Sequence, residues 1–153
     1  MPDKWVQWVE ENMLRGVPPE NLMQILRAKG FHPCYNRPLM QKMCIWVLLD
    51  DFLREHPNLD LDGLLLDPYL QTWIRGIANR GIDGKVVIDA LKGRGIDLEA
   101  FHPQYARRVL HNELGTVMET DGKRSVLFDV FVACAKGYLR EVQIYLYCGF
   151  PVD

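Results

Sequence analysis

The stretch WVQWVEENMLRGVPPENLMQILRAKGF, residues 5–31, returns later in the chain as LQTWIRGIANRGIDGKVVIDALKGRGI, residues 70–96. The two stretches align without a gap at a constant offset of 65, from residue 5 to residue 70. The residues that are identical in both are Trp8 and Trp73, Arg15-Gly16 and Arg80-Gly81, Leu26 and Leu91, and Gly30 and Gly95. Self-similarity of this kind indicates a duplicated structural unit.

A shorter phrase follows each copy. FHPCYNR, residues 31–37, returns as FHPQYAR, residues 101–107, now at an offset of 70. Residues 96–100 explain the change of offset as an insertion of five residues in the second copy. The sequence therefore predicts a duplicated helical unit followed by a tail.

Apolar spacing and turn residues predict three helices in the first copy. The first is expected within residues 3–16, with Asp3 as its N-cap, and the second within residues 17–30, where Gly30 supplies the left-handed residue that closes a helix. The third is expected from a cap at Asn36 or Tyr35 to about residue 55. It is apolar nearly all round, which is typical of a helix buried on most sides.

The second copy repeats this plan. Helices are expected at residues 67–79, at residues 83–95 and from about residue 103 onward. Residues 115–124 are polar and rich in turn formers, which favours a loop, and the tail follows from residue 125.

These patterns predict an all-α fold of about eight helices, packed as a bundle or a short solenoid. We expect one helical unit at residues 1–57, its second copy at residues 58–115 and a helical hairpin at residues 125–153. No stretch alternates between apolar and polar residues for long enough to predict a sheet.

Composition narrows the class of protein. The 153 residues carry a net charge of −2, which gives no overall attraction to nucleic acid or to an anionic membrane. No apolar run approaches the roughly 20 residues of a membrane span, and the N-terminus lacks the pattern of a secretory signal. The four cysteines are far apart and have apolar neighbours, which favours reduced, buried thiols in a cytoplasmic protein.

The tail resembles the second half of an ankyrin repeat. There, a helix ends in small residues, a glycine turns the chain, and a second helix ends at another glycine; Gly137 and Gly149 have this spacing. The ankyrin threonine-proline-leucine-histidine turn is absent, because residues 128–131 are FDVF. The resemblance implies a helical hairpin, not an array of repeats.

The duplicated unit is similar to the small helical segment that precedes the catalytic domain in some bacterial prolyl-hydroxylase-like 2-oxoglutarate oxygenases. The residues that carry the resemblance are Asn12, Arg15-Gly16, Leu26, Gly30-Phe31 and Pro33, with Arg80-Gly81, Leu91, Gly95, Phe101 and Pro103 in the second copy. It implies an accessory or docking role. The iron ligands of those enzymes are not present, because His111-Asn112-Glu113 has the local spacing but no histidine follows it.

The repeated phrase provides candidate binding residues. They are His32, Tyr35 and Arg37 in the first copy and His102, Tyr105 and Arg107 in the second. One interpretation places them at a helix N-terminus, where arginine and backbone N–H groups hold a carboxylate or phosphate. In the other, the aromatic rings pack into the core, proline begins the helix, and duplication has preserved a phrase that specifies the fold.

A second candidate is a basic face on the second copy, formed by Arg80, Lys92, Arg94 and Arg108. Residues 87–96, followed by a loop and a helix, are similar to SAP-type DNA-binding modules. Phosphate contacts by such a face would make binding depend strongly on salt. Against this interpretation, the chain is slightly acidic and has no interleaved aromatic and basic residues.

No catalytic set is convincing. Ser125 is the only serine and lacks a glycine-flanked elbow, and cysteines in apolar helices are poor nucleophiles. We therefore expect a non-enzymatic protein without cofactor or metal, acting as an adaptor or regulatory subunit with a protein partner. Self-association through the C-terminal hairpin is a further possibility, and nucleic-acid binding and a role beside an oxygenase are the alternatives.

Overall fold

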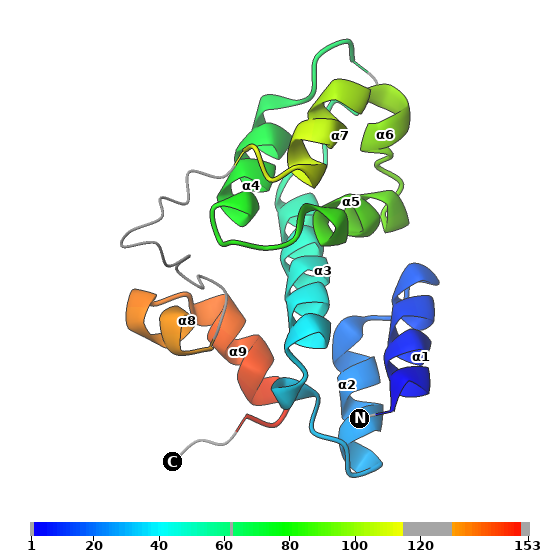
Figure 1. Ribbon diagram of the computed structural model, residues 1–153, viewed down its shortest axis with the longest axis vertical. Coiled ribbons are helices and arrows are strands. Elements are labelled where there is room, and N and C mark those ends of the chain that lie inside the picture. Colours follow the sequence, from blue (N-terminus) through cyan, green and yellow to red (C-terminus); the bar gives the residue numbers. More distant parts are fainter. Residues whose placement is uncertain (1, 62, 115–129, 151–153) are drawn as a thin grey trace. The chain divides into compact units, whose positions relative to one another are not determined.

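The computed structural model describes residues 2–61, 63–114 and 130–150 (Figure 1). Within these ranges the regular structure is entirely helical and contains no strand, so the predicted all-α class is confirmed. The elements are α1 (Asp3–Leu14), α2 (Pro19–Ala28), the 3-10 helix η1 (Pro33–Tyr35), α3 (Arg37–Glu55), α4 (Pro68–Ala78), α5 (Gly84–Gly93), α6 (Leu98–Phe101), α7 (Pro103–Leu110), α8 (Val130–Lys136) and α9 (Leu139–Tyr147). The loop predicted at residues 115–124 lies outside the described ranges.

The helices form two compact units. The first unit is Met1–Leu48 together with Val130–Asp153, and the second is Leu49–Asp129. These boundaries differ from the three segments predicted from the sequence, residues 1–57, 58–115 and 125–153. The helix α3 contributes residues to both units, and the hairpin formed by α8 and α9 belongs to the same unit as α1 and α2.

The first unit is built around the N-terminal part of α3. Three of its side chains, Leu39, Met40 and Cys44, are fully buried, as the all-round apolar pattern predicted. The buried apolar residues that α1 and α2 contribute to the first unit are Val9, Met13, Leu22, Met23 and Leu26. Burial of this apolar surface is the main source of stability.

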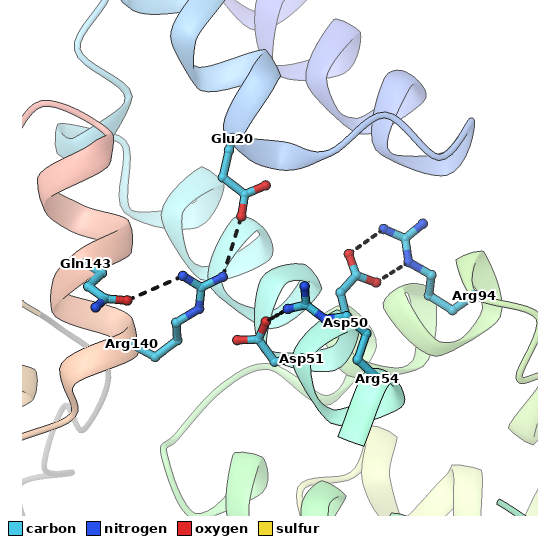
Figure 2. A network of polar contacts seen from close by, with 7 residues as sticks. All are labelled: Glu20, Asp50, Asp51, Arg54, Arg94, Arg140 and Gln143. Carbon is cyan, nitrogen blue, oxygen red and sulfur yellow. Dashed lines mark hydrogen bonds and ion pairs between the residues drawn. The ribbon is translucent and has the colours of Figure 1, made fainter. Parts of the chain in front are cut away.

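The hairpin of α8 and α9 belongs to this core. Cys148 is fully buried, and its Sγ lies 3.8 Å from Sδ of Met43 on α3. At the surface, Nη1 of Arg27 donates a 2.9 Å hydrogen bond to the carbonyl oxygen of Tyr147. Arg140 pairs with Glu20 at 3.7 Å and also donates to Gln143 (Figure 2). A buried contact and polar surface contacts therefore hold the last helix against α2 and α3.

The second unit combines the end of α3 with α4, α5, α6 and α7. Leu70 and Ile74 of α4 and Leu91 of α5 are fully buried. The ring of Phe52, near the end of α3, stacks on Trp73 with centroids 5.6 Å apart. The amphipathic faces expected from the sequence are thus the faces that meet in this core.

The turns of the two copies have matching geometry. Gly30 and Gly95 both have positive φ, +86° and +85°, and the amide that follows each donates to the carbonyl five residues back, at Leu26 and Leu91. A left-handed residue with this hydrogen bond is a common helix terminus that favours glycine. The predicted role of Gly30 in closing a helix is confirmed.

Side chains cap the N-termini of α3, α4 and α5, and of the two caps expected for α3, Tyr35 or Asn36, the structure has Asn36. Oδ1 of Asn36 accepts from the amide of Leu39, and Asp67 and Asp83 accept from the amides of the second residue of α4 and α5. The prediction for Asp3 was wrong, since Asp3 lies inside α1 and Pro2 precedes it. There its carboxylate is in the first turn, where negative charge is favourable.

Candidate functional site

The repeated phrase lines a cleft in each unit. In the first unit, η1 and the start of α3 border a shallow cleft of about 670 Å³, lined by Gly30, Phe31, His32, Tyr35, Asn36, Arg37 and Pro38. The predicted residues His32, Tyr35 and Arg37 therefore come together. Pro33 and Cys34, between them, are buried and anchor the turn.

Tyr35 stands at the exposed side of the first cleft. Its side chain is 65% exposed, and its ring lies 6.1 Å from His32 and 6.4 Å from Phe150. Because the hydroxyl reaches solvent, it needs no partner within the protein.

The second cleft has a volume of about 400 Å³. It is lined by Leu64, Leu65, Leu66, Gln71, His102, Pro103, Gln104, Tyr105 and Arg108. His102 and Tyr105 of the phrase are here, but Arg107 is not, and Arg108 takes its place. The reason is helical spacing, because Tyr105 and Arg108 lie three residues apart on one face of α7, and His102 directly precedes this helix.

Tyr105 differs from Tyr35 in its surroundings. Its hydroxyl oxygen is buried, and no residue of the described ranges forms a hydrogen bond with it. Burial raises the pKa of Tyr105, although the positive charges of Arg75 and Arg108 act in the opposite direction. The neutral hydroxyl is therefore a hydrogen-bond donor without an acceptor, which costs on the order of 1–3 kcal/mol.

The charged side chain in the lining of the second cleft is basic. Arg108 lines the cleft, and Arg75 is close enough to influence Tyr105 electrostatically. Both arginines are exposed, and neither pairs with an acid among the residues that the structure places. No lining residue is acidic.

One wall of the second cleft is apolar and solvent-exposed. Leu64 is 101% exposed and Leu65 83%, whereas Leu66 is buried. The segment is fixed at its end because Nε2 of Gln71 donates a 2.7 Å hydrogen bond to the carbonyl oxygen of Leu66. The sequence patterns described above did not single out this segment, although three consecutive leucines in a polar stretch are a usable signal.

The predicted basic face loses one member. Arg94 makes a two-point ion pair with Asp50, with Nε–Oδ1 and Nη2–Oδ2 distances of 2.6 and 2.9 Å (Figure 2), and its side chain is only 16% exposed. Arg80 is half-buried, Lys92 is exposed, and Arg108 belongs to the second cleft. Arg94 is therefore committed to an internal contact in place of a phosphate.

We expect Asp50→Asn to destabilise the protein by about 2 kcal/mol, a value between those typical of exposed and buried ion pairs. The substitution leaves the guanidinium of Arg94 largely buried without its carboxylate. Urea unfolding followed by circular dichroism measures the loss. The control is Arg54→Gln, since Arg54 pairs with Asp51 but is 73% exposed, and its loss should cost below about 0.5 kcal/mol. Equal effects would contradict the structural role of the Asp50 pair.

The cysteines were expected to be buried, and three of them are. Cys34, Cys44 and Cys148 are buried, but Cys134 is exposed on α8, so the prediction was wrong there. Burial raises the pKa of Cys148 to about 12 and also raises that of Cys34. These two thiols are neutral near pH 7 and poor nucleophiles. Ser125, the single serine, lies outside the described residues.

No group of three or more histidine, cysteine, aspartate or glutamate side chains in the described ranges is placed to hold a metal ion. Among the helices described, none combines the length and the apolar character needed to cross a membrane.

Comparison with known proteins gives no match to a protein-family model, to a curated protein or to a solved structure.

Proposed function

We propose that this chain is a non-catalytic protein-binding module, an adaptor or accessory subunit, and that a partner protein docks in the second cleft. The observation that carries the proposal is the pair of exposed leucines, Leu64 and Leu65, on the wall of a cleft that also contains a buried, unpartnered hydroxyl. Exposed apolar side chains beside a cleft are typical of interaction sites. A partner would cover the leucines and give the hydroxyl an acceptor.

A protein partner fits this cleft better than nucleic acid. Leucine side chains gain from contact with apolar groups, whereas phosphates gain from clustered cations. Arg94 is held by Asp50, which weakens the SAP-like alternative. The net charge of −2 also provides no long-range attraction to a polyanion.

We also propose that the fold arose by duplication. We take the two units to contain copies of one ancestral helical module, with an ankyrin-like hairpin added at the end. The matching turns at Gly30 and Gly95, and a cleft at each copy of the repeated phrase, support this view. A docking role agrees with the resemblance to the accessory segment of oxygenases, and a cytoplasmic location remains part of the proposal.

The test compares the proteins captured by three forms of the full chain. Leu64→Asp combined with Leu65→Asp is expected to abolish specific capture, because two charges replace the apolar wall. Leu14→Asp is the control, since Leu14 is 57% exposed on α1 and lines neither cleft. Quantitative mass spectrometry reads the result. A specific protein captured equally by all three forms would place the interface elsewhere.

The C-terminal hairpin favours a second candidate function, self-association. Phe131 on α8 is 74% exposed and Leu139 on α9 is 73% exposed, so the hairpin presents apolar groups of its own. Light scattering after size exclusion, over a range of concentrations, tests this candidate. A dimer of the wild type that Leu139→Asp converts to a monomer would support it, whereas a monomer at every concentration would remove it.

A further inference from the structure

We infer that the second cleft recognises an acidic peptide segment of the partner, in which a carboxylate stands beside a large apolar side chain. This inference rests on the proposed function and adds the chemistry of the ligand. The apolar side chain would pack on Leu64 and Leu65. The carboxylate would accept hydrogen bonds from the guanidinium of Arg108 and, after a shift of the side chains that cover it, from the hydroxyl of Tyr105, whose oxygen is buried in the free protein.

The hydroxyl of Tyr105 sets the first requirement. It is buried and lacks a hydrogen-bond partner among the described residues, and it belongs to a side chain that lines the cleft. A buried donor without an acceptor destabilises the free protein. A ligand that supplies an acceptor removes this unfavourable contribution, so its binding is favoured. A hydroxyl near two positive charges is a stronger donor, and the best acceptor for it is an anionic oxygen.

The charges around the cleft set the second requirement. Arg108 lines it, Arg75 acts on Tyr105, and none of the lining residues is acidic. Neither arginine pairs with an acid in the described ranges. A guanidinium holds a carboxylate through two parallel hydrogen bonds, so charge complementarity selects an acidic partner.

The leucine wall and the volume set the third requirement. A free anion alone would leave Leu64 and Leu65 in water, but a peptide can place an apolar side chain against them. The cleft of about 400 Å³ is in the range, roughly 300–1,000 Å³, of sites that hold a small ligand or a few side chains. A short segment, not a whole domain surface, is the natural occupant.

The experiment selects short peptides from a random phage-displayed library on the full chain. An enriched sequence is then synthesised with a fluorescein label and titrated by fluorescence polarisation. We expect enriched peptides to contain aspartate or glutamate within a residue or two of leucine, isoleucine, phenylalanine or methionine. Tyr105→Phe and Arg108→Gln are each expected to weaken binding about tenfold.

Two matched controls isolate the cleft. Tyr35→Phe removes the hydroxyl from the equivalent tyrosine of the first cleft, and Arg107→Gln removes an exposed arginine beside Arg108 that does not line the second cleft. Both should leave affinity within about twofold of the wild type. Tyr105→Phe should also leave the urea midpoint of unfolding unchanged or raised, because it deletes an unsatisfied polar group. Weaker binding together with undiminished stability is the result expected if the hydroxyl of Tyr105 binds a ligand and does not stabilise the fold.

Other outcomes overturn the inference. These are enrichment without acidic residues, no enrichment at all, or binding that ignores both Tyr105→Phe and Arg108→Gln. Short duplex or single-stranded DNA that binds more tightly than the peptide, and is weakened equally by Arg107→Gln and Arg108→Gln, would also overturn it in favour of a nucleic-acid face. If capture depends on Leu64 and Leu65 but not on Tyr105 or Arg108, the proposed function stands and the inference on ligand chemistry fails.

Discussion

Gly84→Ala is expected to destabilise the second unit by about 3 kcal/mol or more, the upper range for overpacking. A Cβ atom at this position would lie 2.0 Å from the carbonyl oxygen of Val109 and 2.7 Å from its carbonyl carbon, both backbone atoms of α7. Real Cβ atoms do not approach backbone so closely, and a backbone atom cannot turn away as a flexible side chain can. The first turn of α5 would therefore have to separate from α7.

The measurement is urea unfolding followed by tryptophan fluorescence, with hydrogen exchange at the amides of α5 and α7. Gly76→Ala is the matched control, because Gly76 lies inside α4 of the same unit and nothing is within 4 Å of its added Cβ. Alanine there should stabilise by up to about 1 kcal/mol through helix propensity. If Gly84→Ala were as harmless as Gly76→Ala, the close contact between α5 and α7 would be wrong.

Leu26→Ala and Leu91→Ala are expected to cost about 3 kcal/mol each, within the range for leucine in a packed core. The two leucines occupy the same position of the repeat, and both are fully buried, one in each unit. Each truncation removes apolar contacts and leaves a cavity that rigid neighbours fill only in part. Similar losses at both sites are the result expected if the copies use this position alike.

Ile25→Ala controls for the loss of a large apolar residue from α2. Ile25 adjoins Leu26 in the chain but is 42% exposed, so its truncation should cost below about 1 kcal/mol. Denaturant titration of all three variants, with hydrogen exchange to assign each loss to its unit, completes the test. A mild effect at Leu26 or Leu91 would contradict the core positions assigned to them.

Much of the helical plan could be predicted because it depends on local chemistry. Asp67 and Asp83 have side chains suited to capping, Gly30 can adopt positive φ, and the sequence of α3 is apolar nearly all round. Each of these signals is contained within a few consecutive residues. These signals can therefore be recognised without knowing which helices pack together.

The grouping of the hairpin with the first copy could not be predicted in the same way. The contact of Cys148 with Met43 joins residues 105 positions apart, and no local pattern encodes such a distance. The requirement for glycine at position 84 could not be predicted either, because the backbone carbonyl that excludes a side chain there belongs to another helix. Contacts of this kind depend on the packing of the finished core.

The candidate site was predicted in part. Repetition of the phrase singled out His32, Tyr35 and Arg37, which do share one cleft. In the second copy, repetition pointed to Arg107, but the face of α7 that borders the cleft carries Arg108. The hydroxyl of Tyr105 is buried whereas Tyr35 is 65% exposed, and this difference depends on tertiary packing, so the phrase alone could not distinguish the two tyrosines.

The first unit is discontinuous, with the whole of the second unit inserted between its two parts. A ribosome makes a chain from its N-terminus, so residues 49–129 emerge, and can fold, before Ile144, Tyr145 and Cys148 exist to complete the earlier core. Until then, α2 and α3 expose the apolar surface that these residues later cover. The core begun by the first residues is thus completed only after the second unit has been made, so its apolar surface stays exposed to aggregation throughout that interval of synthesis.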